Sequence, residues 1–386
     1  MLKIFNSFSL KKEDFEPFDK SHVKIFICGP TLYDYTHLGH ARIFLTYDLL
    51  CRYLQARGFK TDMLVNMTDI NQNVFNKATE QTVDYRTLTR FYSGQFIKDL
   101  ELLNIITITR LAHVSDYVKK ITEHIHFFME HKNAYSANGN IYFDTQTVND
   151  YGVISKQSRQ QLNLHRLDIG PNKKNQEDIM LWNCSEDFGF SWQGDFGEGV
   201  PWWHIQDTTV AFENFGTRYD IHGGAKELVY PHHEAHFAQY KALTGLENPV
   251  KLWMHVGLVL SNGEKMSKSL GNMVLSRKIV EKYGQNLLRL YIFSTHYRDE
   301  INYNENDLRD KKLLLEKIYN TRNKTSDNTS PIISNLIDEF LVSFEDDFDS
   351  PQAIDVLDRI CTLVLQGENI TPQDFEKIIG VLGLSI

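Results

Sequence analysis

The stretch of this 386-residue chain that first invites a chemical interpretation is "PHHEAHF", residues 231–237, with three histidines in five positions. If this stretch is helical, His232 and His236 lie four residues apart on one face, which is the spacing of paired metal ligands. His233 and Glu234 would then point elsewhere. The local pattern fits a metal site and a cluster of hydrogen-bonded structural histidines about equally well, so the choice depends on the rest of the chain.

A second candidate is His37-Leu38-Gly39-His40, just after an apolar run, "VKIFICGP" (23–30), that predicts a buried strand. Where a helix follows such a strand, backbone N–H groups and the helix dipole favour a polyphosphate, and Gly39 permits its close approach. The imidazoles of His37 and His40 can donate to phosphate oxygens as charge develops at an α-phosphorus. Taken alone, the same four residues could be a helix-capping turn.

A third candidate is Lys265-Met266-Ser267-Lys268-Ser269, in the polar loop "SNGEKMSKSLGN". Lys265 and Lys268 on a loop flanked by Gly and Ser can hold a departing pyrophosphate. Alone, the loop could simply be exposed and basic. Together and in this order, each motif following a predicted strand, the histidine and lysine motifs predict cleavage of ATP at its α-phosphate.

The elements that must position these residues follow from hydrophobic periodicity. The strand at 23–30, a helix over 43–59 and a second strand at 60–68 form a βαβ unit, which predicts a parallel sheet. A later strand is predicted at 251–260, directly before the lysine loop. From about residue 275 onward helical periodicity dominates, and polar stretches at 170–178 and 320–331 punctuate the chain.

Composition limits the classes of protein to which this chain can belong. Its 42% hydrophobic and 24% charged residues are ordinary for a globular protein, and no apolar run approaches the length of a membrane span. The N-terminus lacks a signal-peptide core, and four scattered cysteines fit a reducing cytoplasm. Residues 331–386 contain 11 acidic and two basic residues, which makes this end a poor place to dock RNA.

Six stretches together carry a family resemblance: "FICGPTLYDYTHLGHAR", "VNMTDIN", "DIMLWN", "PWWHIQD", "YDIHGGAKELVYPHHE" and "NGEKMSKSLGN". In register from about residue 2 to 384, the chain resembles cysteinyl-tRNA synthetases, which are class I aminoacyl-tRNA synthetases. It also resembles a close relative, the ligase that joins cysteine to glucosaminyl-inositol in mycothiol synthesis. The resemblance implies an α/β fold, with a Rossmann-type catalytic domain interrupted by an insertion and followed by an α-helical bundle. The expected boundaries are 1–115 and 201–300 for the two catalytic halves, 116–200 for the insertion and 301–386 for the bundle.

The resemblance also assigns roles to residues. His37 and His40 would stabilise the transition state at the α-phosphate, while Lys265 and Lys268 would hold pyrophosphate. Mg²⁺ is expected with ATP. The positions that match the amino-acid pocket are Gly29, Thr68 and Trp203, and those that match the nucleotide site are Gly39, His222, Gly223, Gly224, Lys265, Met266, Ser267, Lys268 and Ser269.

In this family a zinc ion holds the thiolate of substrate cysteine, and the matching ligand positions here are Cys28, Asp207, His232 and His236. Asp207 stands where the family has a cysteine, and His236 where it has a glutamate. All four remain residue types that bind zinc, but the formal charge of the ligand set changes from −3 to −2, which makes the site harder and less electron-rich. The alternative is a lost metal with hydrogen-bonding residues left behind.

Other departures adjoin the same pocket: Asn71, Gln72, Asn183, Val200 and Trp202 replace the residues usual in the family. The chain keeps Arg42 after the histidine motif, as synthetases do, and shows no match to their anticodon-reading domain. The leading hypothesis is therefore a cytoplasmic, monomeric ligase that activates cysteine or a related amino acid and transfers it to a small amine or other non-tRNA acceptor. One alternative is a cysteine–tRNA ligase with a shortened C-terminus, and another is a pseudo-synthetase that acts as a binding or regulatory module.

Overall fold

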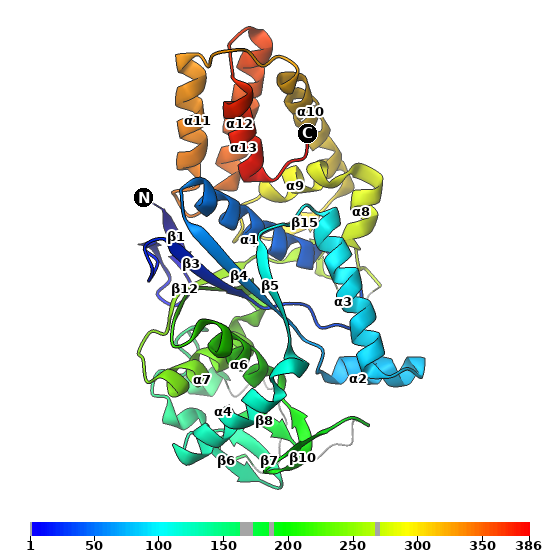
Figure 1. Cartoon of the computed structure of the whole chain (residues 1–386), viewed down its shortest axis with the longest axis vertical. Coiled ribbons are helices and arrows are strands. Elements are labelled where there is room, and N and C mark those ends of the chain that lie inside the picture. Colours follow the sequence, from blue (N-terminus) through cyan, green and yellow to red (C-terminus); the bar gives the residue numbers. More distant parts are fainter. Residues whose placement is uncertain (1, 163–172, 185–188, 267–270) are drawn as a thin grey trace.

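The computed structural model describes residues 2–162, 173–184, 189–266 and 271–386. At its centre lies a five-stranded parallel sheet with the order β12-β11-β3-β4-β5 (Figure 1). These strands span Val250–Val256 (β12), Tyr219–Ala225 (β11), His22–Ile27 (β3), Lys60–Met67 (β4) and Ile108–His113 (β5). All seven residues of β11 are buried, as expected for a parallel strand covered on both faces. The α/β class and the βαβ unit predicted from periodicity are confirmed.

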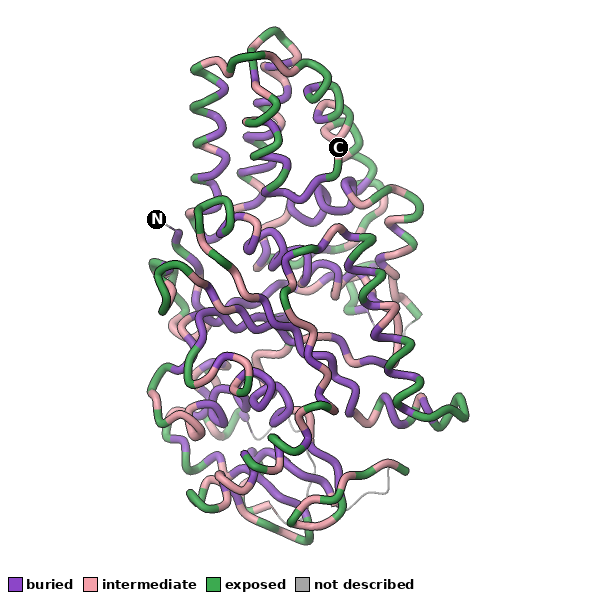
Figure 2. The backbone as a smooth tube through the Cα atoms, in the orientation of Figure 1, coloured by how far each residue is buried: buried purple, intermediate pink, exposed green. Residues whose placement is uncertain are grey.

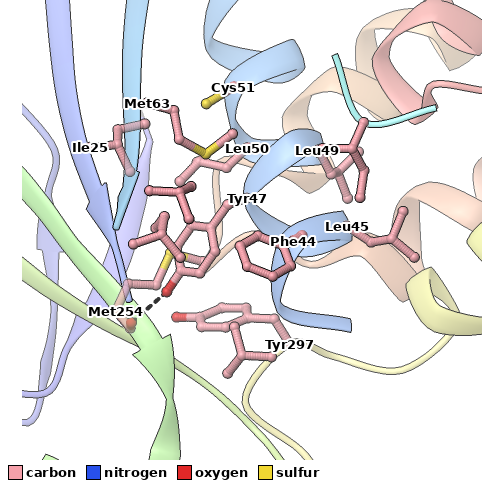
Figure 3. Packing of buried hydrophobic residues seen from close by; sticks show 14 of the residues in the cluster. Ile25, Phe44, Leu45, Tyr47, Leu49, Leu50, Cys51, Met63, Met254 and Tyr297 are labelled. Carbon is pink, nitrogen blue, oxygen red and sulfur yellow. Dashed lines mark hydrogen bonds between the residues drawn. The ribbon is translucent and has the colours of Figure 1, made fainter. Parts of the chain in front are cut away.

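Helix α1 (Leu38–Ala56) crosses from β3 to β4 and packs on the sheet through apolar side chains such as Phe44, Leu50 and Tyr47 (Figure 3). The Tyr47 hydroxyl donates to the Met254 carbonyl at 2.6 Å and accepts from the Gly224 N–H at 3.0 Å. A Cβ atom at Gly223 would lie 2.3 Å from the Tyr47 ring. Tyr47 therefore fixes α1 against the middle of the sheet, and Gly223 leaves it the space to do so.

Two long segments connect strands of the central sheet. Helices α2 (Gln72–Gln81) and α3 (Tyr85–Leu102) join β4 to β5. Between β5 and β11 the chain forms helix α4 (Val118–Glu130) and a second sheet with the order β6-β7-β8-β10-β9, in which all pairs are antiparallel. Its strands span Ala134–Ala137 (β6), Asn140–Phe143 (β7), Ile179–Asn183 (β8), Trp192–Gly194 (β9) and Gly197–Pro201 (β10). This sheet lies at the lower end of the molecule in Figure 1, away from the C-terminal helices.

Helices α6 (Trp203–Phe215) and α7 (Glu234–Thr244) lie between the two sheets (Figure 1). Residues Val229–His233 form a π-helical turn with a non-helical Tyr230, and α7 begins only at Glu234. Tyr230 is the one residue of this turn with non-helical φ/ψ, and the turn runs directly into α7. His232 and His236 therefore keep the helical spacing considered from the sequence, and both face α6, where His232 bonds His204 and His236 bonds Thr208.

The C-terminal part is helical and covers the opposite end of the molecule. Strands β13 (Val259–Ser261), β14 (Glu264–Lys265) and β15 (Ile301–Tyr303) form a small sheet. Two helices lie between β14 and β15 in the chain and four follow β15, and the helices have buried inner faces and exposed outer faces (Figure 2). Buried Arg289 pairs with buried Asp48 at 2.5 Å and so ties α9 to α1. The helices are α8 (Ser276–Tyr283), α9 (Gln285–Phe293), α10 (Glu305–Arg322), α11 (Pro331–Ser343), α12 (Ser350–Gln366) and α13 (Pro372–Leu382).

Among the described residues, no helix combines the length and the apolar character that crossing a bilayer requires. Two short N-terminal strands, β1 (Lys3–Asn6) and β2 (Lys11–Asp14), complete the fold as an antiparallel pair. The polar stretch at 320–331 connects α10 to α11. The domain boundaries expected from the sequence stay predictions.

Candidate active site

A cavity of about 220 Å³ opens where the carboxyl ends of β3, β4, β11 and β12 meet. This edge is where parallel α/β sheets bind ligands. Eleven of the residues singled out from the sequence line it: Cys28, Gly29, His37, Gly39, His40, Thr68, Trp203, Asp207, His232, Lys265 and Met266. The structure thus brings together motifs that are more than 200 residues apart in the chain.

One end of the cavity, which we call the phosphate end, consists of His37, Gly39, His40 and Lys265. His37 is the N-cap of α1, and its Nδ1 accepts the Gly39 N–H at 3.0 Å. The rings of His37 and His40 lie 3.8 Å apart, an approach that the missing side chain of Gly39 permits, because a Cβ there would lie 2.8 Å from the His37 ring. The first turn of α1 is therefore shaped around two imidazoles.

His40 combines burial with an unused polar atom. Burial, with a smaller contribution from His37, lowers the pKa of His40 well below its ordinary value, so its ring is neutral at physiological pH. Its Nδ1 is buried, and no described residue offers it a hydrogen-bond partner. The His40 ring lines the cavity, although this nitrogen is itself closed off from solvent.

Lys265 reaches the phosphate end from β14 and pairs with the carboxylate of Glu227. The adjacent Met266 is buried against the cavity, and its Cε lies 4.0 Å from the position of a Cβ on Gly39. Lys265 and Met266 thus lie beside the histidine motif. Ser267, Lys268 and Ser269 lie outside the described residues.

The opposite end, which we call the amino-acid end, consists of Gly29, Thr68 and Trp203. The Asn66 side chain joins this end together: its Oδ1 accepts the Gly29 N–H, and its Nδ2 donates to Thr68 Oγ1 at 3.2 Å and to Asp207 Oδ1. A Cβ at Gly29 would collide with the Asn66 carbonyl at 1.7 Å, so only glycine fits there. Trp203 stacks on His232 at 4.4 Å between ring centres with an interplanar angle of 12°.

His222, Gly223 and Gly224, expected on the nucleotide side, are buried in β11 and are not among the residues that line the cavity. Gly223 provides space for Tyr47, as described above. A Cβ at Gly224 would lie 3.0 Å from the His233 ring. The two glycines therefore let a tyrosine and a histidine pack against the strand, and their assignment to the nucleotide stays a prediction.

Three of the four expected metal ligands come together. One ligand atom each from Cys28, Asp207 and His232 lies within 4.8 Å of the other two, and all three residues are buried. His236 belongs to neither candidate group found among the described residues. Its Nε2 bonds the Tyr219 hydroxyl at 2.7 Å and its Nδ1 bonds Thr208 Oγ1 at 3.3 Å, so both ring nitrogens are occupied. The implied set of four does not fit as a set.

A second group of possible ligands consists of Cys28, His222 and His233. Together with His204, His232, His236 and His255, these imidazoles form a buried histidine cluster beneath the amino-acid end. Burial lowers the pKa values of His204, His222, His233 and His236 well below the ordinary value, because the charged form loses its solvation. Neutral imidazole is also the form that binds metal.

Arg42 is buried in α1, behind the part of the cavity wall that Gly257 and Leu258 form. Its Nη1 donates to the carbonyls of Gly257 and Leu258, and its Nη2 to those of His296, Tyr297 and Asp299. Gly257 and Leu258 line the cavity. A single guanidinium thus connects the helix of the histidine motif to the loop that follows β12.

Comparison with known proteins agrees with this arrangement. Residues 14–313 match the family model described as "tRNA synthetases class I (C) catalytic domain". A cysteine–tRNA ligase of Wigglesworthia glossinidia brevipalpis is 35% identical over 99% of this chain and 83% of its own length. One from Thermococcus onnurineus is 36% identical over 83% of this chain and 67% of its own. The chain belongs to the cysteinyl-tRNA synthetase family.

The fold of this cysteinyl-tRNA synthetase family member extends to distant synthetases. A methionyl-tRNA synthetase of Mycobacterium tuberculosis, solved with methionyl-adenylate, superposes with a TM-score of 0.70 at 14% identity, covering 94% of this chain and 88% of that one. At this identity the likeness concerns the fold alone. It confirms the class I architecture predicted from the motifs.

Sequence reasoning missed three residues that shape the site in this family member. Asn66 joins Gly29 to Asp207, Glu227 pairs with Lys265, and His233 contacts Cys28. Asn66 and His233 stand inside stretches that carried the resemblance, "VNMTDIN" and "YPHHE", but their contacts lie across 141 and 205 residues of chain. Only the pairing of distant elements reveals them.

Proposed function

We propose that this chain is a cysteine–tRNA ligase, which activates its amino acid with ATP and transfers it to tRNA. The observation that carries the proposal is the single cavity with a phosphate end and an amino-acid end, built from the residues that the family motifs occupy. The relatives named cysteine–tRNA ligase, matched over almost the whole chain, favour tRNA as the acceptor. They do not support the small-amine acceptor that the sequence first suggested.

In the first step a carboxylate oxygen of the amino acid attacks the α-phosphorus of ATP, and the bond to pyrophosphate breaks. His37 and His40 lie at the first turn of α1, where their ring nitrogens and the helix N–H groups can bond the phosphate oxygens. Lys265 contributes a positive charge for the departing pyrophosphate, with Glu227 holding the side chain beforehand. Lys268 is assigned the same role from its motif alone.

At the other end Trp203 covers the cavity beside His232, while Thr68 and the Gly29 backbone define its edge. These groups hold the amino acid and exclude water from the adenylate. Mg²⁺ is expected with ATP, and the donors for zinc cluster around Cys28, which belongs to both groups of possible ligands. The acyl group then passes to a ribose hydroxyl of tRNA with release of AMP.

Two assays test this function in sequence. ATP–pyrophosphate exchange with each amino acid identifies the activated substrate, and we expect cysteine to give the highest rate. Acid-precipitable charging of purified cysteine tRNA then tests the acceptor. Cysteine-dependent exchange without charging, together with discharge of the adenylate by primary amines, would overturn tRNA as the acceptor; absence of exchange with any amino acid would overturn the ligase itself.

A further inference from the structure

We propose that Arg277, in the first turn of α8, is a positioning residue for adenylate formation. Through it, the segment that follows the lysine motif (265–269) is fixed against the segment that leads into the histidine motif (37–40). Arg277 is not among the residues that line the cavity, so it acts on the reaction through other residues. The inference rests on the proposed function, because adenylate formation is the step that needs both motifs.

The segment after the lysine motif runs antiparallel to the segment that leads into the histidine motif. Four consecutive pairs of residues connect the two segments: Leu38 with Val274, His37 with Leu275, Thr36 with Ser276, and Tyr35 with Arg277. The Leu38 N–H donates to the Val274 carbonyl at 2.8 Å. The Ser276 N–H and hydroxyl both donate to the Thr36 carbonyl, at 3.3 and 3.1 Å. Arg277 supplies the last pair of this series.

The Arg277 guanidinium makes contacts along its edge and on its face. Its Nε and Nη2 lie 3.1 and 2.9 Å from Asp99 Oδ1, and its Nη1 donates to Gln95 Oε1 at 3.0 Å. The guanidinium carbon lies 4.2 Å from the centre of the Tyr35 ring. A planar guanidinium can pair with a carboxylate along its edge and stack on an aromatic ring at the same time, which a lysine ammonium cannot do. Arg277 therefore connects α8 both to α3 and to the segment before the histidine motif.

Helix α3 is itself packed against α1, the helix that begins at the histidine motif. The buried rings of Phe96 in α3 and Phe44 in α1 have their centres 5.0 Å apart. Helices α3 and α8 lie side by side (Figure 1). The Asp99 side chain is 1% exposed, and a buried carboxylate that loses its partner is strongly unfavourable, so Asp99 holds Arg277 in place. The three helices therefore form a closed set of contacts around the segment 274–277.

The lysine motif is bounded by two different kinds of structure. On the side of Lys265 the chain enters from β14, a strand of two residues. On the other side the chain is paired residue by residue with the segment that carries His37, up to Arg277. This pairing keeps the later boundary of the lysine motif in register with His37. Since misplacing reacting groups by about 1 Å can slow a reaction about 10²-fold, the contacts of Arg277 contribute to the rate from outside the cavity.

ATP–pyrophosphate exchange of Arg277→Ala tests this role. We expect kcat to fall by about 10–100-fold, with little change in the KM for cysteine, because the motifs are misplaced while the amino-acid end is untouched. Arg277→Lys, which keeps the charge beside Asp99 but not the planar contacts, should recover part of the rate. Lys278→Ala, at the exposed neighbouring position of α8, is the control and should stay within about twofold of the unmodified chain. An unchanged kcat in Arg277→Ala, or a loss confined to KM, would overturn the proposal.

A double-mutant cycle with Lys265→Ala separates positioning from a general loss of structure. If Arg277 acts by placing the lysine motif, Arg277→Ala should slow exchange much less in the Lys265→Ala background than in the unmodified chain, because the two residues then act as a unit. Losses that multiply in the double variant would show that Arg277 acts independently of the lysine motif and would contradict the proposal.

Hydrogen exchange of the Leu38 and Ser276 amides examines the pairing without any activity. Both amides donate across the two segments, so both should exchange faster in Arg277→Ala, while the amide of Ile25 in the centre of β3 should not change. Unchanged exchange at Leu38 and Ser276 would overturn the proposal even if the chain activates no amino acid, so this readout separates a wrong role for Arg277 from a wrong function. If circular dichroism shows that Arg277→Ala does not fold, Arg277→Lys takes its place in both measurements.

Discussion

The phosphate end and the histidine cluster both present imidazoles near one cavity, yet they use them in opposite ways. At the phosphate end, His40 has a buried Nδ1 without a partner among the described residues, and the Lys265 ammonium pairs with Glu227 at an exposed position. In the histidine cluster, His222, His233 and His236 each engage both ring nitrogens. Groups that must respond to transient charge keep spare hydrogen-bonding capacity, whereas groups that hold a fixed geometry use theirs within the protein.

The strongest test of this contrast is His40→Ala. Since the His40 ring lines the phosphate end and is assigned to the transition state, adenylate formation should slow by about 10²–10³-fold, the usual effect of removing one preorganised donor. Thermal stability should change little, because no protein hydrogen bond to Nδ1 is lost. ATP–pyrophosphate exchange measures the rate, with exposed His131→Ala as the control. Exchange within twofold of the unmodified chain would show that His40 is not part of the phosphate end.

A second test concerns Asn66, in the cavity wall beside the histidine cluster, where a substitution is expected to lower stability. Asn66→Ala removes bonds to Gly29, Thr68 and Asp207 and leaves buried polar atoms unpaired. The free energy of unfolding should fall by about 2–3 kcal/mol, measured by urea denaturation. Asn76→Ala, at an exposed position of α2, is the control and should change it by less than about 0.5 kcal/mol. An equally small change in Asn66→Ala would show that this network contributes no stability.

A third test concerns Glu234, which binds the loop at residues 152–155 next to the histidine cluster. The Glu234 carboxylate, next to His233, accepts the Gly152 N–H at 2.8 Å and the Ser155 N–H at 2.7 Å with different oxygens. Glu234→Gln keeps one acceptor but places an amide N–H against the other donor, so stability should fall by about 1–2 kcal/mol. Hydrogen exchange at residues 152–155 should accelerate before global unfolding. Unchanged exchange there would indicate that Glu234 does not hold this loop.

The smallest expected effect concerns His124, a buried histidine outside both the phosphate end and the histidine cluster. Burial, followed by Lys120, lowers the pKa of His124 to about 4, although Glu213 lies 3.3 Å away. Between pH 6.5 and pH 4, His124 is therefore protonated in the unfolded chain but not in the folded chain. The free energy of unfolding accordingly falls as pH decreases.

In His124→Gln this contribution disappears, so the slope of unfolding free energy against pH should decrease by about 1 kcal/mol per pH unit in that range. His126→Gln, on the exposed side of α4, is the control and should leave the slope unchanged. Equal slopes for the unmodified chain and His124→Gln would place the pKa of His124 near its ordinary value.

How far the sequence could predict the molecule differs between the same two regions. The phosphate end follows from local order: an apolar strand, a histidine motif at a helix start, and a lysine motif after a later strand, all of which the structure places together. The histidine cluster depends on where distant elements meet. The spacing of His232 and His236 suggested paired ligands, but the ring nitrogens of His236 contact Tyr219 and Thr208 instead of joining Cys28 and Asp207. Neither the contact of His233 with Cys28 nor that of Asn66 with Asp207 has any local signal.

Arg42 fixes the distance between two parts of the cavity wall. Its two terminal nitrogens reach five carbonyls, a number that the three N–H donors of a lysine could not satisfy. Because the guanidinium plane is set by acceptors on both sides, the first turn of α1 and the peptide groups of Gly257 and Leu258 keep a constant separation. Adjustment to ligands of different length then falls to the wall that carries Lys265, which among the described residues is restrained by a two-residue strand, one ion pair between exposed side chains and a hydrogen bond from Asn272 Nδ2 to the Lys265 carbonyl.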